Sequence, residues 1–133
     1  MIAADTSVAV AAFAAWHEKH DTARRAIDRG ARLVAHCALE TYSVLTRLPA
    51  PHRAPPAVVR DYLAARFPEG FLRLSEAAYR TFLRTLPDRA IAGGAAYDAL
   101  VAATAAAEGS DLLTCDRRAL PVYERYAVRA VLL

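Results

Sequence analysis

The chain has 133 residues, which is the size of one domain, and residues 1–133 are expected to form a single folded unit. Hydrophobic residues make up 56% of the sequence, which excludes a disordered chain, and no apolar run reaches the ~20 residues that cross a bilayer. The net charge of +3 suits a polyanionic partner such as a nucleic acid, although solubility alone explains it nearly as well. The N-terminus lacks the pattern of a signal peptide, so a cytoplasmic location is expected.

Short apolar runs alternate with helical patterns along the first half of the chain. The patterns predict strands at residues 2–4 and 32–35 and helices at residues 7–16, 21–29 and 38–48, followed by a helix that starts near residue 56. Asp21 is expected to cap the second of these helices and Gly30 to end it. Pro56 has the fixed backbone that suits a first helical position.

The second half continues the alternation. It predicts strands at residues 71–74, 112–114 and 128–133, helices at residues 76–86 and 96–108, and a helical turn at residues 118–123. Ser75 can cap the first of these helices, and Gly93-Gly94 forms a flexible loop before the second. Strands that alternate with helices indicate an α/β fold, and apolar strands such as Leu112-Leu113 fit a parallel sheet covered on both faces.

Acidic residues recur where predicted strands end. Asp5 and Asp116 follow strands, and Glu40 lies just beyond another, in the expected first turn of a helix. Because the carboxyl ends of parallel strands share one edge, these side chains should meet there. Asp98 follows the Gly93-Gly94 loop and joins them if its helix begins at the same edge. Clustered carboxylates repel one another, and a divalent cation such as Mg²⁺ or Mn²⁺ removes that cost.

Each acid also has a plain structural explanation. Glu40 and Asp98 in first helical turns would favour the helix dipole. Asp5 and Asp116 are well placed to cap the helices that follow, and Asp116 could pair with Arg117 or Arg118. Spacing alone therefore leaves the shared cluster and the separate caps as open alternatives.

Four segments resemble the PIN-domain family, and within it the VapC toxins of VapBC toxin–antitoxin pairs. They are Ile2-Ala3-Ala4-Asp5-Thr6-Ser7, the segment 36–45 around Glu40, the segment 93–105 around Asp98, and Leu113-Thr114-Cys115-Asp116-Arg117-Arg118. The resemblance implies a three-layer α/β/α sandwich with a central parallel sheet. It also implies an endoribonuclease that needs Mg²⁺ or Mn²⁺ and acts as the toxin of a type II pair.

The resemblance assigns roles to particular residues. Asp5, Glu40, Asp98 and Asp116 become the catalytic and metal-binding acids. Thr6, Ser7 and Thr114 become candidates for orienting carboxylates or waters, with helix capping as the competing role. Arg89, Arg117 and Arg118 are candidates for RNA phosphate contacts, or else solvated surface charges.

The resemblance further implies an RNA substrate, a VapB-type antitoxin and a homodimer, with no membrane association. The antitoxin is expected to dock on apolar and aromatic side chains, or these form the core: Trp16, Tyr42, Leu45, Leu48 and Tyr62. Cys37 and Cys115 are expected to be reduced core thiols. His17, His20, His36 and His52 are expected to be structural or at the surface rather than catalytic.

Two other functions compete with this interpretation. A phosphatase of the HAD type also begins with an Asp after its first strand, but it needs a second Asp two residues later, where this chain has Ser7. A PIN fold without activity could instead serve as an RNA-binding or interaction module. Tight RNA binding without cleavage at any Mg²⁺ or Mn²⁺ level would favour that alternative.

Overall fold

A four-stranded sheet forms the centre of the computed structural model, which describes residues 1–133. Its strands are β1 (Ile2–Ala4), β2 (Arg32–Leu33), β3 (Asp111–Thr114) and β4 (Ala130–Leu132), in the order β2-β1-β3-β4. Every neighbouring pair is parallel, and Ala3 of β1 pairs with Arg32 on one side and Leu112 on the other. The chain moves to one side of β1 to make β2 and to the other side to make β3. A switch of this kind opens a crevice at the carboxyl ends of the strands.

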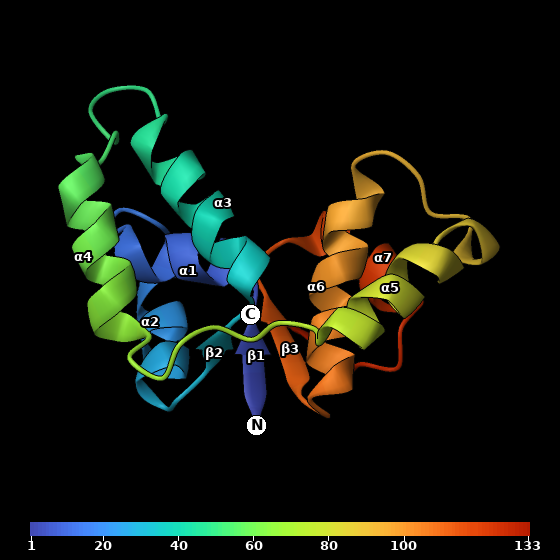
Figure 1. Ribbon diagram of the computed structural model, residues 1–133. Helices are drawn as coiled ribbons and strands as arrows, with labels where there is room; N and C mark the ends of the chain where they lie inside the picture. Colours follow the sequence, from blue (N-terminus) through green and yellow to red (C-terminus); the bar gives the residue numbers. More distant parts are fainter.

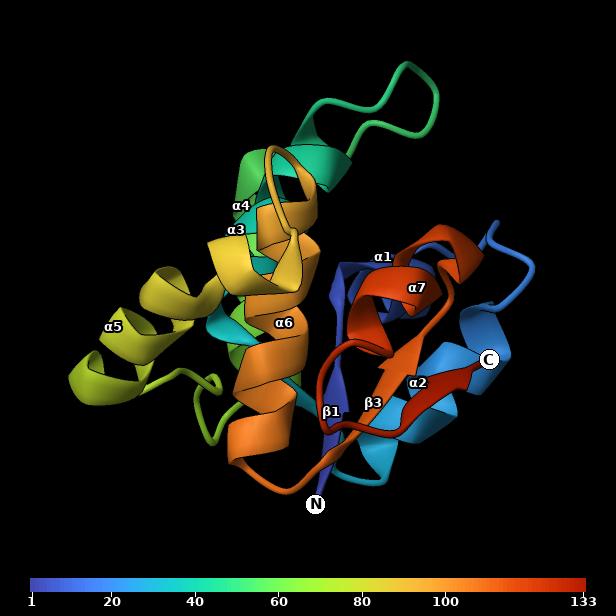
Figure 2. The ribbon, with the colours of Figure 1, turned by 90° about the vertical axis from the view of Figure 1, so that its right-hand side faces the viewer.

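Helices cover both faces of this sheet. They are α1 (Thr6–Phe13), α2 (His20–Asp28), α3 (Ala35–Thr46), α4 (Pro56–Arg66), α5 (Glu76–Thr85), α6 (Ala95–Ala107) and α7 (Leu120–Tyr123), with short 3₁₀ turns η1 (Pro87–Arg89) and η2 (Arg117–Ala119). Figure 2 shows α3 and α6 on one side of the strands and α2 and α7 on the other. The predicted α/β sandwich with a parallel sheet is therefore confirmed. No helix is both long and apolar enough to cross a membrane.

Small side chains let the helices approach the strands closely. Ala3 and Ala4 of β1 are fully buried, and they pack in one cluster with Leu112 of β3 and with Ala102 and Ala105 of α6. Interiors pack as densely as organic crystals, so this contact leaves little room for larger side chains. The packing fixes the start of α6 beside the carboxyl end of β1, and that placement matters for the site.

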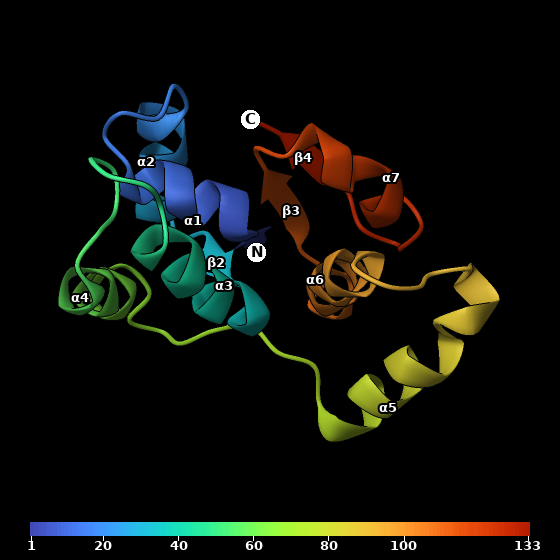
Figure 3. The ribbon, with the colours of Figure 1, turned by 90° about the horizontal axis from the view of Figure 1, so that it is seen from above.

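Two groups of helices spread to either side of the central strands. In Figure 1, α1, α2, α3 and α4 lie on one side, and α5, α6 and α7 lie on the other. Viewed from above in Figure 3, α5 lies on the outer side of α6, away from the strands. In the view of Figure 1, the helices α3 and α6 therefore lie on opposite sides of the central strands.

Most predicted elements are present, with four corrections. The first helix ends at Phe13 and does not continue to Trp16. The second helix begins at His20 with Lys19 at its N-cap, so Asp21 lies in the first turn and does not cap it. Residues 71–74 form no strand, because the backbone of Leu72 makes only a single bridge to Val34. Leu72 is apolar because it is buried, which a short apolar run cannot distinguish from strand pairing. β2 also stops at Leu33, since α3 starts at Ala35.

One predicted partner-binding residue belongs to the core instead. Leu45 is almost fully buried between α3 and α4, where it packs with Ala54 and Val59. Tyr42 and Leu48 are partly buried against the same cluster, and only Trp16 of the predicted set is largely exposed. The apolar spacing in α3 thus serves mainly to hold α4, which was the open alternative.

Candidate functional site

Two acids lie at the carboxyl edge of the sheet, as the strand positions require. Asp5 follows β1 directly, and its backbone N–H donates to the carbonyl of Leu113 at 3.2 Å. Asp116 lies two residues beyond β3. Both also cap helical turns: Asp5 accepts from the backbone of Val8 in α1, and Asp116 accepts from the backbone of Arg118 in η2. Asp5 and Asp116 therefore cap helical turns and also lie together at the carboxyl edge of the sheet.

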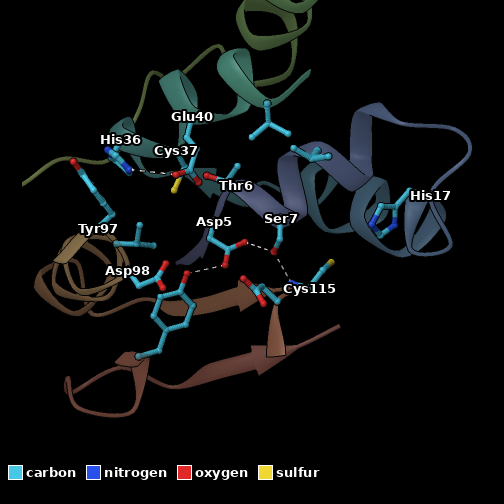
Figure 4. A pocket seen from close by; sticks show the side chains of 15 residues that line it. Asp5, Thr6, Ser7, His17, His36, Cys37, Glu40, Tyr97, Asp98 and Cys115 are labelled. Atoms are coloured by element: carbon cyan, nitrogen blue, oxygen red, sulfur yellow. Dashed lines mark hydrogen bonds and ion pairs between the residues drawn. The ribbon is translucent and has the colours of Figure 1, made fainter. Parts of the chain in front are cut away.

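The other two acids reach the same place from helices. Asp98 lies in the first turn of α6, as expected. Glu40 does not lie in the first turn, because α3 begins at Ala35 and Glu40 falls in its second turn. The helix dipole acts mainly within the first turn, so it does not explain an acid at that position. Figure 4 shows Asp98 approaching Asp5 from α6 and Glu40 approaching from α3.

All four acids line one cavity of about 290 Å³ between α3 and α6. Its other lining residues are Thr6, Ser7, Val10, His17, His36, Cys37, Val44, Tyr97, Val101, Cys115 and Tyr123. The structure thus brings together every acid that the sequence singled out. Arg89, Arg117 and Arg118 do not line the cavity.

Asp5 is buried and rigidly held. The Ser7 hydroxyl and the Val8 N–H donate to its Oδ1, and the Tyr123 hydroxyl donates to its Oδ2 at 2.8 Å. Burial raises the pKa of Asp5, and the hydrogen bonds from Ser7, Tyr123 and Val8 offset part of that effect. Burial and the neighbouring Asp5 in turn raise the pKa of Tyr123, which keeps its hydroxyl available as a donor.

Ser7 and Thr114 link the ends of β1 and β3. Their hydroxyl oxygens lie 3.3 Å apart, and Ser7 Oγ also accepts from the backbone N–H of Cys115 at 2.7 Å. Thr114 Oγ1 accepts from the backbone N–H of Asp116 at 2.9 Å. These bonds fix the segment that carries Asp116 relative to Asp5. Thr6 Oγ1 is buried in the same cavity without any hydrogen-bond partner.

The acids repel one another across the cavity. Burial raises the pKa of Asp98, and the charges of Asp116, Asp5 and Glu40 raise it further. Neither Asp5 nor Asp98 has a basic side chain within ion-pair distance, whereas Glu40 lies 3.6 Å from His36. Asp116 lies 3.7 Å from the guanidinium of Arg118, which is almost fully exposed. The cavity therefore holds more negative charge than its neighbours neutralise.

Among the lining residues that were not assigned to the site from the sequence, four carry polar rings. Tyr123 contacts Asp5, His36 approaches Glu40, and Tyr97 and His17 lie on the wall. His36 precedes Glu40 by one helical turn and Tyr97 precedes Asp98 by one residue, so proximity to the acids was a usable signal. Tyr123 offered none, because it is 118 positions from Asp5 along the chain.

The cysteines and the remaining basic residues have simpler positions. Cys37 is a buried free thiol, as predicted, while Cys115 is free but only half-buried, at the cavity wall. Arg89 is engaged elsewhere: it donates to the carbonyl of Arg125 and lies over the ring of Tyr126, 4.2 Å from the ring centre. Arg118 therefore lies closest to the acids among the three arginines considered for RNA contacts.

The donor set fits a hard divalent cation in its chemistry. Carboxylate oxygens are the ligands that Mg²⁺ and Mn²⁺ prefer, and the unpartnered Thr6 hydroxyl lies in the same cavity. As the side chains stand, no group of three or more His, Cys, Asp or Glu residues is positioned to hold a metal ion. The four acids share a cavity without forming a closed ligand set.

Comparison with known proteins gives consistent matches over the whole chain. A sequence model of the PIN domain matches residues 2–126. Ribonuclease VapC40 of Mycobacterium tuberculosis is 53% identical over 133 residues, covering 100% of this chain and 99% of that protein. Ribonuclease VapC27 of the same species is 41% identical over 135 residues, covering 98% of this chain and 95% of that protein.

Solved structures with the same fold are more distant in sequence. FitAcB from Neisseria gonorrhoeae superposes with a TM-score of 0.65 at 18% identity, covering 98% of this chain and 96% of the other. VapBC2 from Rickettsia felis, bound to a DNA fragment from its promoter, gives a TM-score of 0.63 at 15% identity, covering 98% and 99%. At these identities the likeness concerns the fold.

Proposed function

The chain belongs to the PIN-domain family, and from this premise we propose that it is a metal-dependent endoribonuclease of the VapC type. The main support for the proposal is that one cavity at the carboxyl edge of the sheet is lined by four acids, Asp5, Glu40, Asp98 and Asp116. The full-length similarity to ribonucleases supplies the reaction class, which is hydrolysis of RNA phosphodiester bonds.

Asp5, Asp98 and Asp116, with Glu40, are the residues that would hold Mg²⁺ or Mn²⁺. When bound, such an ion supplies charge stabilisation for the phosphate and an activated water at neutral pH. Burial raises the pKa of Asp98, and the charges of the other three acids raise it further; a cation in the cavity would relieve that repulsion, which supports this assignment.

The chain's own residues prepare the site before any substrate arrives. Ser7, Val8 and Tyr123 occupy both oxygens of Asp5 with donors, so the carboxylate keeps one orientation. Thr114 holds the backbone of Asp116. Groups that orient ligand carboxylates in this way contribute to metal affinity and activity, so Ser7 and Thr114 act as positioning residues. Thr6 lines the same cavity, and its buried hydroxyl remains a candidate for orienting a carboxylate or a water.

We also propose that the protein is the toxin of a type II pair and binds a VapB-type antitoxin. The similarity to VapC proteins supports this partner, and one structural neighbour is a VapBC complex. The exposed Trp16 is the best candidate anchor in the predicted docking set, since Leu45 belongs to the core. A basic side chain of the antitoxin placed among the acids would inhibit the enzyme. A homodimer and a cytoplasmic site of action complete the proposal.

A cleavage assay on total cellular RNA tests the enzyme activity. The wild-type chain should cut RNA with Mg²⁺ or Mn²⁺ and stop when EDTA is added, while Asp98→Asn should not cut. Asp88→Asn, an exposed acid in η1 outside the cavity, is the matched control and should cut normally. Tight RNA binding without cleavage at any metal concentration would contradict the proposal and favour an inactive interaction module. The family match leaves the HAD-type phosphatase without support.

A further inference from the structure

Two aromatic rings stack at the wall of the acidic cavity. His36 of α3 and Tyr97 of α6 lie nearly parallel, with ring centres 5.2 Å apart and an interplanar angle of 12°. Both rings line the cavity, and Figure 4 shows them side by side at its edge. We call this pair the aromatic platform. It bridges the two helices that carry Glu40 and Asp98.

The platform lies next to the acids in space as well as in sequence. Tyr97 immediately precedes Asp98, and His36 Nε2 lies 3.6 Å from Glu40 Oε2. A phosphate group held at the acids would therefore have its neighbouring nucleotide within reach of the two rings. No other stacked or tilted aromatic pair has both of its rings on this cavity wall.

Tyr97 leaves a large part of its ring to solvent. It is 59% exposed, although one face is covered by His36. The open surface of the ring is apolar, flat and adjacent to a cavity rich in oxygen ligands. A flat π-surface beside a phosphate-binding region is the arrangement that proteins use to hold single-stranded nucleic acid.

We propose that the aromatic platform of His36 and Tyr97 stacks one unpaired nucleobase of the RNA substrate beside the acidic cavity. This inference rests on the proposed ribonuclease function and adds a requirement for single-stranded RNA near the cleavage site. Stacking tolerates any base, because every base has a π-face. The platform thus positions the strand without defining a sequence by itself.

Fluorescence quenching of 2-aminopurine tests stacking directly. Short single-stranded oligoribonucleotides, each with 2-aminopurine at a different position, are titrated in Mg²⁺ with the Asp116→Asn protein, which lacks one of the proposed ligand acids, and a gel verifies that the RNA stays intact. At one position the fluorescence should be quenched on binding. Adding Tyr97→Ala to this background should remove the quenching and weaken binding by about 5- to 150-fold, the range for loss of one stacked base. Tyr97→Phe should preserve both effects, since it keeps the ring.

Tyr79→Ala provides the matched control. Tyr79 is the other largely exposed tyrosine, lies on α5 and does not line the acidic cavity, so its removal should leave quenching and affinity unchanged. In the otherwise wild-type protein, Tyr97→Ala should raise KM for single-stranded RNA, and thermal unfolding should verify that the variant is folded.

The stacking proposal and the proposed ribonuclease function are refuted by different results. Equal affinity, quenching and KM for wild type and Tyr97→Ala, in a protein that does cut RNA, would overturn the platform and leave the function intact. Quenching that depends on Tyr97, in a protein that cuts no RNA with Mg²⁺ or Mn²⁺, would support the platform and refute the nuclease.

Discussion

The amino and carboxyl edges of the central sheet differ in whether their aspartates have a basic partner. At the amino end of β3, Asp111 faces Arg129 at 3.0 Å; Arg129 is well exposed and Asp111 is partly exposed. At the carboxyl end, Asp5 and Asp98 have no basic partner within ion-pair distance, although Asp5 is only 4% exposed. The acids Asp28, Asp61 and Glu76 elsewhere in the chain each pair with an arginine.

Unbalanced negative charge is thus found inside the cavity at the carboxyl edge and not at the amino edge. A chain with more basic than acidic residues has enough arginines to pair every acid, yet Asp5 and Asp98 lie in the cavity without a basic partner within ion-pair distance. Like charges in a partly buried cavity cost free energy, which a bound cation or the protonation of a carboxyl group relieves. At the carboxyl edge, burial and the neighbouring carboxylates raise the pKa of Asp98, whereas Asp111 at the amino edge has an arginine partner.

Removal of the Asp5 carboxylate should have the largest effect on RNA cleavage. Both Asp5→Ala and Asp5→Asn should lower RNA cleavage by at least about 100-fold, because even groups that only orient ligands cost roughly 10- to 100-fold. Asp5→Ala should also lower the free energy of unfolding by about 1–3 kcal/mol, since it removes the cap of α1 and leaves Ser7 and Tyr123 without an acceptor. Asparagine keeps the cap, so Asp5→Asn should unfold nearly like wild type.

Asp111→Asn at the opposite edge is the control for this prediction. An exposed ion pair contributes at most about 1 kcal/mol, so cleavage should be unaffected and the free energy of unfolding should change by no more than that. Urea denaturation and single-turnover cleavage give the two quantities. Equal loss of cleavage in Asp111→Asn and Asp5→Asn would show that the edges do not differ.

Tyr123→Phe should have a smaller effect that separates positioning from stability. The change removes the donor to Asp5 Oδ2 and should lower cleavage by about 10- to 100-fold, with a raised requirement for metal. Tyr62→Phe is the matched control, because the Tyr62 hydroxyl donates to the carbonyl of Ala9 at the same distance of 2.8 Å, outside the cavity. Each variant should lose about 0.5–3 kcal/mol of unfolding free energy, yet only Tyr123→Phe should lose activity. Similar activity of Tyr123→Phe and Tyr62→Phe would show that the Tyr123 hydroxyl does not position Asp5 for cleavage.

The smallest effect concerns the stability of the metal-free protein as pH changes. The pKa of Asp98 is raised above its ordinary value of 3.8, so the folded state holds this proton more tightly than the unfolded state. Stability from this group is therefore present below pH 3.8 and is lost as pH rises through the raised pKa. In EDTA, Asp98→Asn should gain stability relative to wild type over that window, in thermal unfolding series from pH 3 upward. A difference of the opposite sign would mean that the ionised carboxylate stabilises the fold.

Positions defined by strand ends were predictable from the sequence. Asp5 and Asp116 follow β1 and β3, and parallel strands place their carboxyl ends at one edge whatever the details of packing. Asp98 was predictable because the glycine loop marks the start of α6. The isolated bridge at Leu72 was predicted as a strand, since burial and strand pairing produce the same short apolar run.

Contacts between distant segments were not predictable from spacing. The turn that Glu40 occupies depends on where α3 begins, and the backbone contact between Ala35 and Leu72 at that start is tertiary. The bond from Tyr123 to Asp5 and the stacking of Tyr97 on His36 join separate elements, so no local pattern encodes them. Sequence thus located the acids, while the surrounding side chains that orient them required the fold.

Direct measurement of Mn²⁺ binding tests the central claim that the acids of the cavity bind a divalent cation. Electron paramagnetic resonance can follow free Mn²⁺ during titration of the wild-type chain and of Asp98→Asn, Asp116→Asn and Asp111→Asn. We predict that the wild type and Asp111→Asn bind Mn²⁺ alike, and that each substitution in the cavity weakens binding by about 10-fold or more. Undiminished binding in both Asp98→Asn and Asp116→Asn would contradict the account.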